Sequence, residues 1–230
     1  MRLHPDIRIE RRTIGAEKAP LLVVDQFVSD AEELVANAAL KPYAQSMRYF
    51  PGVRSKASLA YQRVFDTELK PTLLDFFGLD GTTLRFGMCH YSLITTPADK
   101  LATLQRVPHV DSLGWQGLAT IHYLFTRNLG GTAFYRHRKT GFEYLDETRQ
   151  ETYLASLIRE CDGPDAPGPE YINGDTPLFQ QIAKQDGIFN RLLVYRRNSL
   201  HSGCLGRDFV PDTNPLTGRL SINCFIDVGR

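Results

Sequence analysis

The chain has 230 residues and a mass of 26.0 kDa, a size that favours one domain built around one core. Hydrophobic residues make up 42% of it and charged residues 23%, which is typical of a globular protein and excludes an intrinsically disordered chain. The formal net charge of +1 supplies no long-range attraction to polyanions, so we expect neither nucleic acid nor an anionic membrane as a partner.

The start of the chain contains no apolar run of signal-peptide length, and its longest early apolar patch is far too short to cross a membrane. The four cysteines are far apart and form no C-x-x-C pair, so the sequence indicates neither a zinc knuckle nor a redox motif. We therefore expect a cytoplasmic protein with free thiols.

The N-terminal third predicts one short strand and two helices. The strand covers residues 21–24. Ser29 and Glu32 then match the S-x-x-E capping box, which predicts a helix over residues 30–40 that ends before Pro42. An apolar stripe predicts a second helix over residues 66–77, ended by Gly78.

From residue 83 the pattern changes to short runs of β-branched and aromatic residues separated by turn residues. The predicted strands cover residues 83–94, 107–111, 118–125, 132–136, 192–195 and 219–227. A helix over 147–160 and a proline- and glycine-rich loop over 162–169 interrupt them. Such a series of strands is typical of a β-sandwich or barrel.

We expect one domain over residues 1–230, because no internal repeat or low-complexity tract divides the chain. In this prediction residues 1–82 supply a strand and helices that pack on a β-rich core over 83–227. The segment from about 140 to 190 is a helical and loop insert in that core.

His109 and Asp111 are the first residues that suggest chemistry. If residues 107–111 form a strand, the two side chains project from the same face. They would supply two of the three ligands of a 2-His-1-carboxylate facial triad, which leaves other positions of an Fe(II) ion open. His201, which follows the apolar run 192–195, is the candidate third ligand. The H-x-D pattern is short, and a hydrogen-bonded surface pair explains it equally simply.

The segment around Arg219 alternates strictly between polar and apolar residues. Arg219 and Ser221 share one face with Asn223, whereas Leu220 and Ile222 share the other. A buried face that carries an arginine and a serine needs an anionic partner, and a carboxylate would satisfy both. The alternative is an edge strand with a solvated arginine.

Taken in order, these motifs resemble the 2-oxoglutarate- and Fe(II)-dependent oxygenases, in particular their prolyl-hydroxylase-like branch. Pro108-His109-Val110-Asp111 is similar to the first ligand pair of that family. Residues 119–124 resemble the strand that follows this pair, and residues 130–134 the glycine turn. Residues 193–195 and 200–203 resemble the distal ligand strand, and residues 218–221 the co-substrate strand. The resemblance covers residues 84–227.

The resemblance implies a mainly β fold with flanking helices around a double-stranded β-helix, that is, a jelly-roll or cupin-like core. It implies that His109, Asp111 and His201 bind Fe(II). Arg219, assisted by Ser221, would bind the 5-carboxylate of the co-substrate 2-oxoglutarate. The remaining family positions fall on Tyr123, which would contact the same carboxylate, and Tyr91, which would lie near the 1-carboxylate end.

The implied activity is hydroxylation of an unidentified substrate by O2, coupled to oxidative decarboxylation of 2-oxoglutarate to succinate and CO2. One departure concerns the segment between His201 and Arg219, which is longer than the usual hairpin and makes Arg207 a rival for the co-substrate carboxylate. We prefer Arg219 because it belongs to the alternating segment, whereas Arg207 lies beside a glycine in a turn.

A small molecule or a peptide fits the family as the substrate. The candidate contacts are Trp115, as a lid or a core aromatic, and the cationic segment Arg136, His137 and Arg138, as an anion-binding group or a solvated loop. The helix over 147–160 is expected to cap the site or to contact a second copy in a homodimer.

Two other function classes compete with the oxygenase. One is a cupin-like, metal-dependent isomerase or hydrolase that uses the same three ligands without 2-oxoglutarate. The other is a jelly-roll binding module without iron or catalysis. Arg219 and Ser221 discriminate between these classes, because only the oxygenase requires both residues to bind a second carboxylate.

Overall fold

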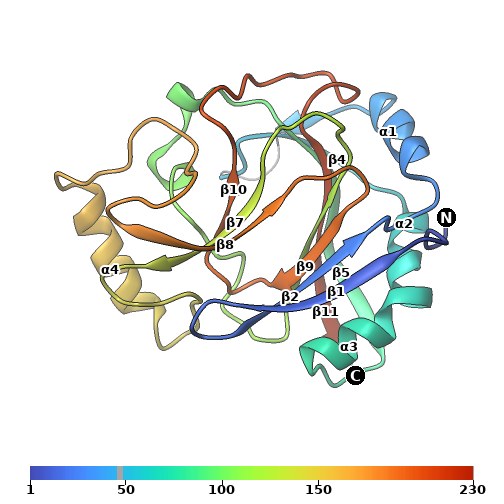
Figure 1. Cartoon of the computed structure of the whole chain (residues 1–230), viewed down its shortest axis with the longest axis horizontal. Coiled ribbons are helices and arrows are strands. Elements are labelled where there is room, and N and C mark those ends of the chain that lie inside the picture. The colour runs from blue at the N-terminus through green and yellow to red at the C-terminus, as the bar shows by residue number, and fades with distance from the viewer. Residues whose placement is uncertain (46–48, 230) are drawn as a thin grey trace.

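The computed structural model describes residues 1–45 and 49–229, and its centre is a pair of β-sheets (Figure 1). The strands of the large sheet are β1 (Arg8–Ile14), β2 (Ala19–Asp25), β3 (Ala44–Gln45), β4 (Gly52–Lys56), β5 (Thr83–Ile94), β6 (Leu118–Tyr123), β9 (Leu192–Arg196) and β11 (Leu220–Gly229). Those of the small sheet are β7 (Gly131–His137), β8 (Phe179–Asp186) and β10 (His201–Cys204). The eight strands of the large sheet follow the order β1-β2-β9-β6-β11-β5-β4-β3, and the three strands of the small sheet the order β10-β7-β8.

The inner faces of the two sheets pack against each other through an apolar cluster. It includes Leu21, Val23, Ile121, Tyr123, Phe134, Leu193 and Tyr195, which come from both sheets. Because strand residues alternate between faces, each of these strands also has an outer face to cover. The sandwich therefore needs a second layer on either side.

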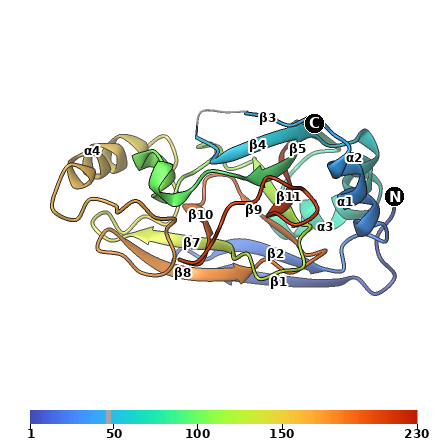
Figure 2. The same cartoon turned by 90° about the horizontal axis from the view of Figure 1, so that it is seen from above.

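Helices supply these outer layers at opposite ends of the molecule (Figures 1 and 2). Residues of α1 (Ala31–Ala39), α2 (Leu59–Val64) and α3 (Lys70–Phe77) pack on the outer face of the large sheet. Helix α4 (Gln150–Cys161) covers the outer face of the small sheet through Tyr153 and Leu157. The result is the predicted mainly β fold with flanking helices.

Strand β11 follows the predicted alternation. Leu220, Ile222 and Cys224 belong to the outer core beneath the helices. Ser221 and Asn223 occupy the intervening positions, and so they face the space between the sheets. The same alternation decides the orientation of every site residue on the large sheet.

The predicted helices differ from the observed ones at their starts. Helix α1 begins at Ala31 after Asp30, and no side chain caps it, so the capping box is wrong: the Ser29 hydroxyl donates to the carboxylate of Asp30 instead. The helix predicted over 66–77 already begins at Leu59, where Ser58 caps α2. A π-helical segment, Phe65–Leu69, joins it to α3 just before Pro71, which has no backbone N–H to donate.

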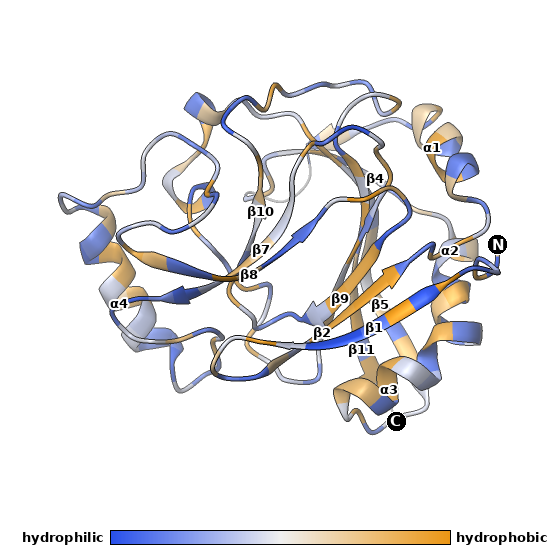
Figure 3. Cartoon of the chain, viewed as in Figure 1, coloured by the Kyte–Doolittle hydropathy of each residue, from blue (hydrophilic) through white to orange (hydrophobic). Residues whose placement is uncertain are grey.

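Most predicted strands are confirmed, but residues 107–111 are not a strand: one bridge, His109 to His201, attaches them to β10. Strands β1, β3, β4, β8 and β10 were not predicted. Strand β1 is the charged edge of the large sheet, and it is largely blue in Figure 3. Its sequence, RIERRTI, offers little of the apolar alternation that identifies a strand.

Among the described residues, no helix has both the length and the apolar surface that a membrane crossing requires.

Candidate metal centre

His109, Asp111 and His201 meet at one edge of the small sheet. The backbones of the two histidines exchange hydrogen bonds of 2.9 Å in both directions, and the Asp111 N–H donates to the carbonyl of Arg197 at 2.8 Å. The Nε2 atoms of His109 and His201 lie 3.7 and 3.6 Å from the two carboxylate oxygens of Asp111. One potential ligand atom from each residue lies within 4.8 Å of the others, close enough for one ion to contact all three.

The protonation of the two imidazoles suits a metal. His201 hydrogen-bonds through Nδ1 to the carbonyl of Ser199 at 2.9 Å, and because a carbonyl only accepts, Nδ1 carries the proton and the Nε2 lone pair is available. Desolvation of the part of the His109 ring that packs against the protein and the proximity of His201 lower the pKa of His109, against the opposing charge of Asp111. The imidazole is therefore mainly neutral at pH 7, the form that binds metals.

The cluster reaches solvent mainly through His109. The side chain of His109 is 54% exposed, whereas Asp111 is 12% and His201 7% exposed. Two nitrogens and one carboxylate on one face fit Fe(II) or another first-row divalent ion, and they leave its remaining positions for exchangeable ligands. The donor set could hold such an ion without rearrangement of the backbone.

Arg219 immediately precedes β11 and is 3% exposed. Its guanidinium donates to the carbonyls of Leu129 at 3.0 Å and Gly131 at 2.7 Å and lies 5.5 Å from the ring centre of Phe125. Among the described residues, no carboxylate lies within ion-pair distance of it. The guanidinium is hydrogen-bonded but its buried charge has no counter-ion among these residues, and a carboxylate ligand would balance that charge.

Ser221 and Tyr123 face the same interior as Arg219. They are direct partners in the pairing of β11 with β6, which places their side chains on one face. The Ser221 hydroxyl donates to the side-chain oxygen of Asn223 at 2.7 Å, and the Tyr123 hydroxyl lies 2.7 Å from that of Thr132. The structure thus brings three of the predicted co-substrate residues together.

Tyr195 connects this group to the three metal-ligand candidates, and sequence reasoning missed it. Its ring centre lies 4.7 Å from that of His201, and burial together with the charge of Asp111 raises its pKa well above the usual value. The available signal was the apolar run 192–195, in which Leu193 and Tyr195 alternate with residues of the outer core.

Tyr91 does not join the co-substrate residues, so this prediction is wrong. It pairs with Ile222 and lies in the outer core beneath the helices, where burial raises its pKa to about 12. The reason is the alternation of side chains along β5. Tyr91 points to the outer face of the sheet, whereas its neighbours His90 and Ser92 point to the interior.

Arg54 on β4 is a second residue that the sequence did not single out. It is 9% exposed and lies opposite Ser92, whose hydroxyl accepts a hydrogen bond from Nε at 3.2 Å. Burial lowers the pKa of Arg54 to about 10, against the opposing charge of Asp111. A buried cation therefore stands within electrostatic reach of the metal-ligand candidates.

The predicted substrate residues are held by other contacts. Arg136 pairs with the buried carboxylate of Glu143, Arg138 pairs with Asp175 at 2.8 Å, and His137 is fully buried, 2.9 Å from Glu160 of α4. His137 therefore lies behind the small sheet, and its assignment as a substrate contact is wrong.

Trp115 is 46% exposed, so it is not a core aromatic. Its ring lies 4.6 Å from that of Tyr144, and its backbone carbonyl accepts from Arg196. Arg207, the rival of Arg219, is 88% exposed near Glu170. Neither its exposure nor its partner resembles the buried environment of Arg219.

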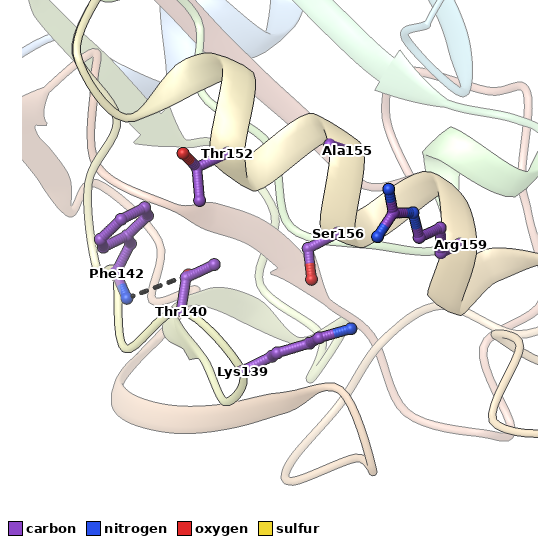
Figure 4. A pocket seen from close by; sticks show the side chains of 7 residues that line it. All are labelled: Lys139, Thr140, Phe142, Thr152, Ala155, Ser156 and Arg159. Atoms are coloured by element: carbon purple, nitrogen blue, oxygen red, sulfur yellow. Dashed lines mark hydrogen bonds between the residues drawn. The ribbon is translucent and has the colours of Figure 1, made fainter.

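A surface hollow of about 410 Å³ lies beside α4, away from the metal-ligand candidates. Figure 4 shows the residues that line it: Lys139, Thr140, Phe142, Thr152, Ala155, Ser156 and Arg159. None of them is a metal-ligand or co-substrate candidate. We therefore place the chemistry between the sheets and not in this hollow.

Three solved structures with the same architecture show which fold class this is. The non-heme alpha-ketoglutarate-dependent epimerase SnoN from nogalamycin biosynthesis matches with a TM-score of 0.52 and 12% identity, over 92% of this chain and 79% of SnoN. HygX from Streptomyces hygroscopicus, with nickel, 2-oxoglutarate and hygromycin B bound, matches with a TM-score of 0.54 and 12% identity, over 92% of this chain and 84% of HygX. The alpha-ketoglutarate-dependent carbocyclase SnoK matches with a TM-score of 0.50 and 11% identity, over 92% of this chain and 81% of SnoK.

At these identities the likeness establishes the fold, which is the double-stranded β-helix that the sequence predicted. The chain itself belongs to the family of unknown function DUF6445, whose model matches residues 5–226. No curated protein matches the chain.

Proposed function

We propose that this protein is a 2-oxoglutarate- and Fe(II)-dependent oxygenase that hydroxylates an unidentified small molecule or peptide. The observation that carries the proposal is the buried Arg219, which has no counter-ion among the described residues and is linked to His201 through Tyr123 and Tyr195. A metal site alone fits several reaction classes. A metal site with a carboxylate receptor beside it fits this one.

The structural neighbours support the same reaction class. HygX has been seen with nickel and 2-oxoglutarate bound, and SnoN and SnoK are alpha-ketoglutarate-dependent. The order of the H-x-D, His and R-x-S motifs supports a finer assignment to the prolyl-hydroxylase-like branch. A single domain, a cytoplasmic location and a homodimer remain part of the prediction.

In the proposed enzyme, His109, Asp111 and His201 hold Fe(II), which when bound couples O2 reduction and decarboxylation of 2-oxoglutarate to substrate oxidation. Arg219 would bind the 5-carboxylate of 2-oxoglutarate. The Tyr123 hydroxyl can donate to that carboxylate when Thr132 donates to Tyr123, and the Ser221 hydroxyl can do so once it turns from Asn223. Tyr195, which is buried with its ring beside that of His201, would help to exclude water from this interior. The Ser199 carbonyl keeps the proton of His201 on Nδ1.

Anaerobic titration of the apo-protein with Fe(II) and 2-oxoglutarate tests the proposal. Wild type is expected to develop the weak visible charge-transfer band of the Fe(II)–2-oxoglutarate chelate. His201→Ala should lose the band through loss of iron, and Arg219→Gln should require at least tenfold more 2-oxoglutarate. Arg207→Gln is the matched control and should titrate like wild type. Thermal unfolding of each variant shows that it is folded.

The outcomes separate the competing classes. Iron binding without a 2-oxoglutarate band would favour the cupin-like isomerase or hydrolase, and no iron binding would favour a binding module. If the band persists in Arg219→Gln but weakens in Arg207→Gln, then Arg207, and not Arg219, binds the 5-carboxylate of 2-oxoglutarate. Asp111→Ala should abolish succinate release from 2-oxoglutarate and O2; turnover at the wild-type rate would contradict the assignment of the metal ligands.

A further inference from the structure

The hollow beside α4 is a candidate binding site that is separate from the metal-ligand candidates. It lies between the turn that follows β7 and one side of α4, and its volume is about 410 Å³ (Figure 4). A hollow of this size can hold a small organic molecule. The proposed binding of iron and 2-oxoglutarate uses none of the residues that line it.

Two exposed cations at one end of the hollow have no acidic partner. Lys139 comes from the turn after β7 and Arg159 from the last turn of α4, and neither forms an ion pair among the described residues. Figure 4 shows the side chain of Lys139 reaching toward the end of the helix that carries Arg159. Arg138, the neighbour of Lys139 in the chain, is by contrast paired with Asp175 at 2.8 Å. Two unpaired cations in the wall of one hollow favour an anionic ligand.

Two hydroxyls in the wall already donate to the protein. The Thr140 hydroxyl lies 2.9 Å from Nδ1 of the buried His137, whose Nε2 lies 2.9 Å from the carboxylate of Glu160. Burial lowers the pKa of His137, so the ring is neutral at pH 7. Because a carboxylate only accepts, Nε2 carries the proton and Thr140 donates to Nδ1. The Ser156 hydroxyl donates to the same carboxylate at 3.1 Å. Recognition of an anion therefore depends mainly on the two cations.

The opposite end of the hollow is aromatic. Phe142 lies there, and Figure 4 shows its ring across the hollow from the two cations. Arg149 stacks on this ring, with its guanidinium 4.7 Å from the ring centre, but its charge is paired with Glu17 at 2.7 Å. The methyl group of Ala155 also lines the hollow. This arrangement suits a ligand with an acidic group at one end and an aromatic ring at the other.

The charge at the cationic end favours a ligand with a single negative charge. Lys139 and Arg159 carry two positive charges. The charges of Lys139 and Glu160 both act on His137, so the acid lies within electrostatic reach of this end of the hollow. One positive charge therefore remains, which one carboxylate would balance. A phosphate dianion would leave an excess of negative charge beside Glu160.

We propose that this hollow binds a small organic acid, whose carboxylate pairs with Lys139 and Arg159 and whose aromatic ring contacts Phe142. The site lies outside the space between the sheets, and it does not depend on the proposed oxygenase function. It gives the protein a second ligand of a stated chemical class, in addition to the proposed metal and co-substrate.

Ligand-observed NMR on the 230-residue chain tests the inference. The probes are phenylacetate, 3-phenylpropionate and indole-3-acetate, each with its primary amide, and cyclohexylacetate as an acid without an aromatic ring. Wild type should bind at least one aromatic acid tenfold or more tightly than its amide. Lys139→Gln and Arg159→Gln should each weaken binding of that acid at least threefold and leave binding of the amide unchanged. Phe142→Leu should reduce the preference for phenylacetate over cyclohexylacetate.

Two control variants separate this hollow from other cations. Arg138→Gln removes a cation that is adjacent in the chain and already paired with an acid, and it should bind the acids like wild type. Arg219→Gln removes the candidate receptor for the co-substrate carboxylate, and it should also keep the preference for acids. Thermal unfolding of each variant shows that it is folded.

Equal binding of acids and amides across the whole panel would overturn the inference. So would an acid preference that persists in a folded variant carrying both Lys139→Gln and Arg159→Gln. A preference that disappears in Arg219→Gln would place the acids at the co-substrate site instead, and an equal loss in Arg138→Gln would reduce the effect to the overall charge of the surface. Cyclohexylacetate binding as tightly as phenylacetate would refute the contact between the ligand ring and Phe142.

Discussion

His122 shows how one residue type serves different purposes in this molecule. It is fully buried in the outer core, stacked on Tyr61 with ring centres 5.8 Å apart, and its Nε2 lies 3.0 Å from the side-chain oxygen of Asn190. Because that oxygen also accepts from the backbone N–H of Val28, Nε2 of His122 is the donor and Nδ1, which has no partner among the described residues, is bare. Protonation of Nδ1 would bury an uncompensated charge.

The buried His122 should therefore make the free energy of unfolding decrease as the pH is lowered. Burial lowers the pKa of His122 to about 4, below the value of about 6.5 expected in the unfolded chain. Between these values the unfolded state binds the proton more readily, so the stabilisation is present above pH 6.5 and is lost as the pH falls toward 4, by up to about 3 kcal/mol. Urea unfolding of wild type and His122→Gln at pH 7.5, 5.5 and 4.5 measures this contribution. A difference between the two proteins that stays constant with pH would contradict it.

At the scale of single residues, the sequence predicted those site positions whose neighbours alternate or whose spacing is local. Arg219 and Ser221 lie in a segment with strict alternation, so their common face could be inferred. Tyr91 could not be oriented in this way, because β5 is buried on both faces near its C-terminal end and a shift of one residue exchanges them. Arg54 was missed because the five-residue strand β4 carries no apolar pattern.

Among the elements, the glycine turn before β7 has the tightest steric requirement. Gly130 has φ +79°, and a Cβ on Gly131 would collide with the backbone carbonyl of Gln185 on the neighbouring strand β8. The carbonyl of Gly131 also accepts a hydrogen bond from Arg219. This turn therefore fixes both the close approach of two strands and the position of the candidate carboxylate receptor.

Gly131→Ala is expected to destabilise the protein by about 1–3 kcal/mol, because β7 and β8 must separate to admit the methyl group. It should also weaken 2-oxoglutarate binding through the displaced Gly131 carbonyl. Gly206→Ala is the control, since a Cβ there meets nothing within 4 Å, and it should change stability by less than about 0.5 kcal/mol. Chemical denaturation checks both; equal effects of the two substitutions would refute the steric argument.

Elements were predicted from the sequence where periodicity is local and missed where tertiary contacts create them. The strand over 83–94 and the helix near 150–160 have clear periods and were predicted within a few residues. Strand β10 has only four residues, and its pairing with β7 depends on chain far away in the sequence. Residues 107–111 have the composition of a strand, yet only His109 finds a partner.

The whole molecule is held together by a sheet that takes strands from all parts of the chain. Strand β2 pairs with β9, β9 with β6, β6 with β11 and β11 with β5, so segments far apart in sequence alternate across it. No cut of the chain leaves this sheet complete on one side. We expect a single cooperative unfolding transition, as the single-domain prediction requires. Scanning calorimetry checks this: the calorimetric and van't Hoff enthalpies should agree, and two resolved transitions would contradict it.

The single bridge between His109 and His201 has a kinetic consequence. The residues whose rings are proposed to share an ion are also those whose backbones exchange the two hydrogen bonds that fasten residues 107–111 to β10. Any opening that frees the two amide protons also parts the two imidazoles. The rate at which these amides exchange with deuterium should therefore measure how often the segment opens and lets a bound ion leave. Binding of a metal ion at the site should slow that exchange.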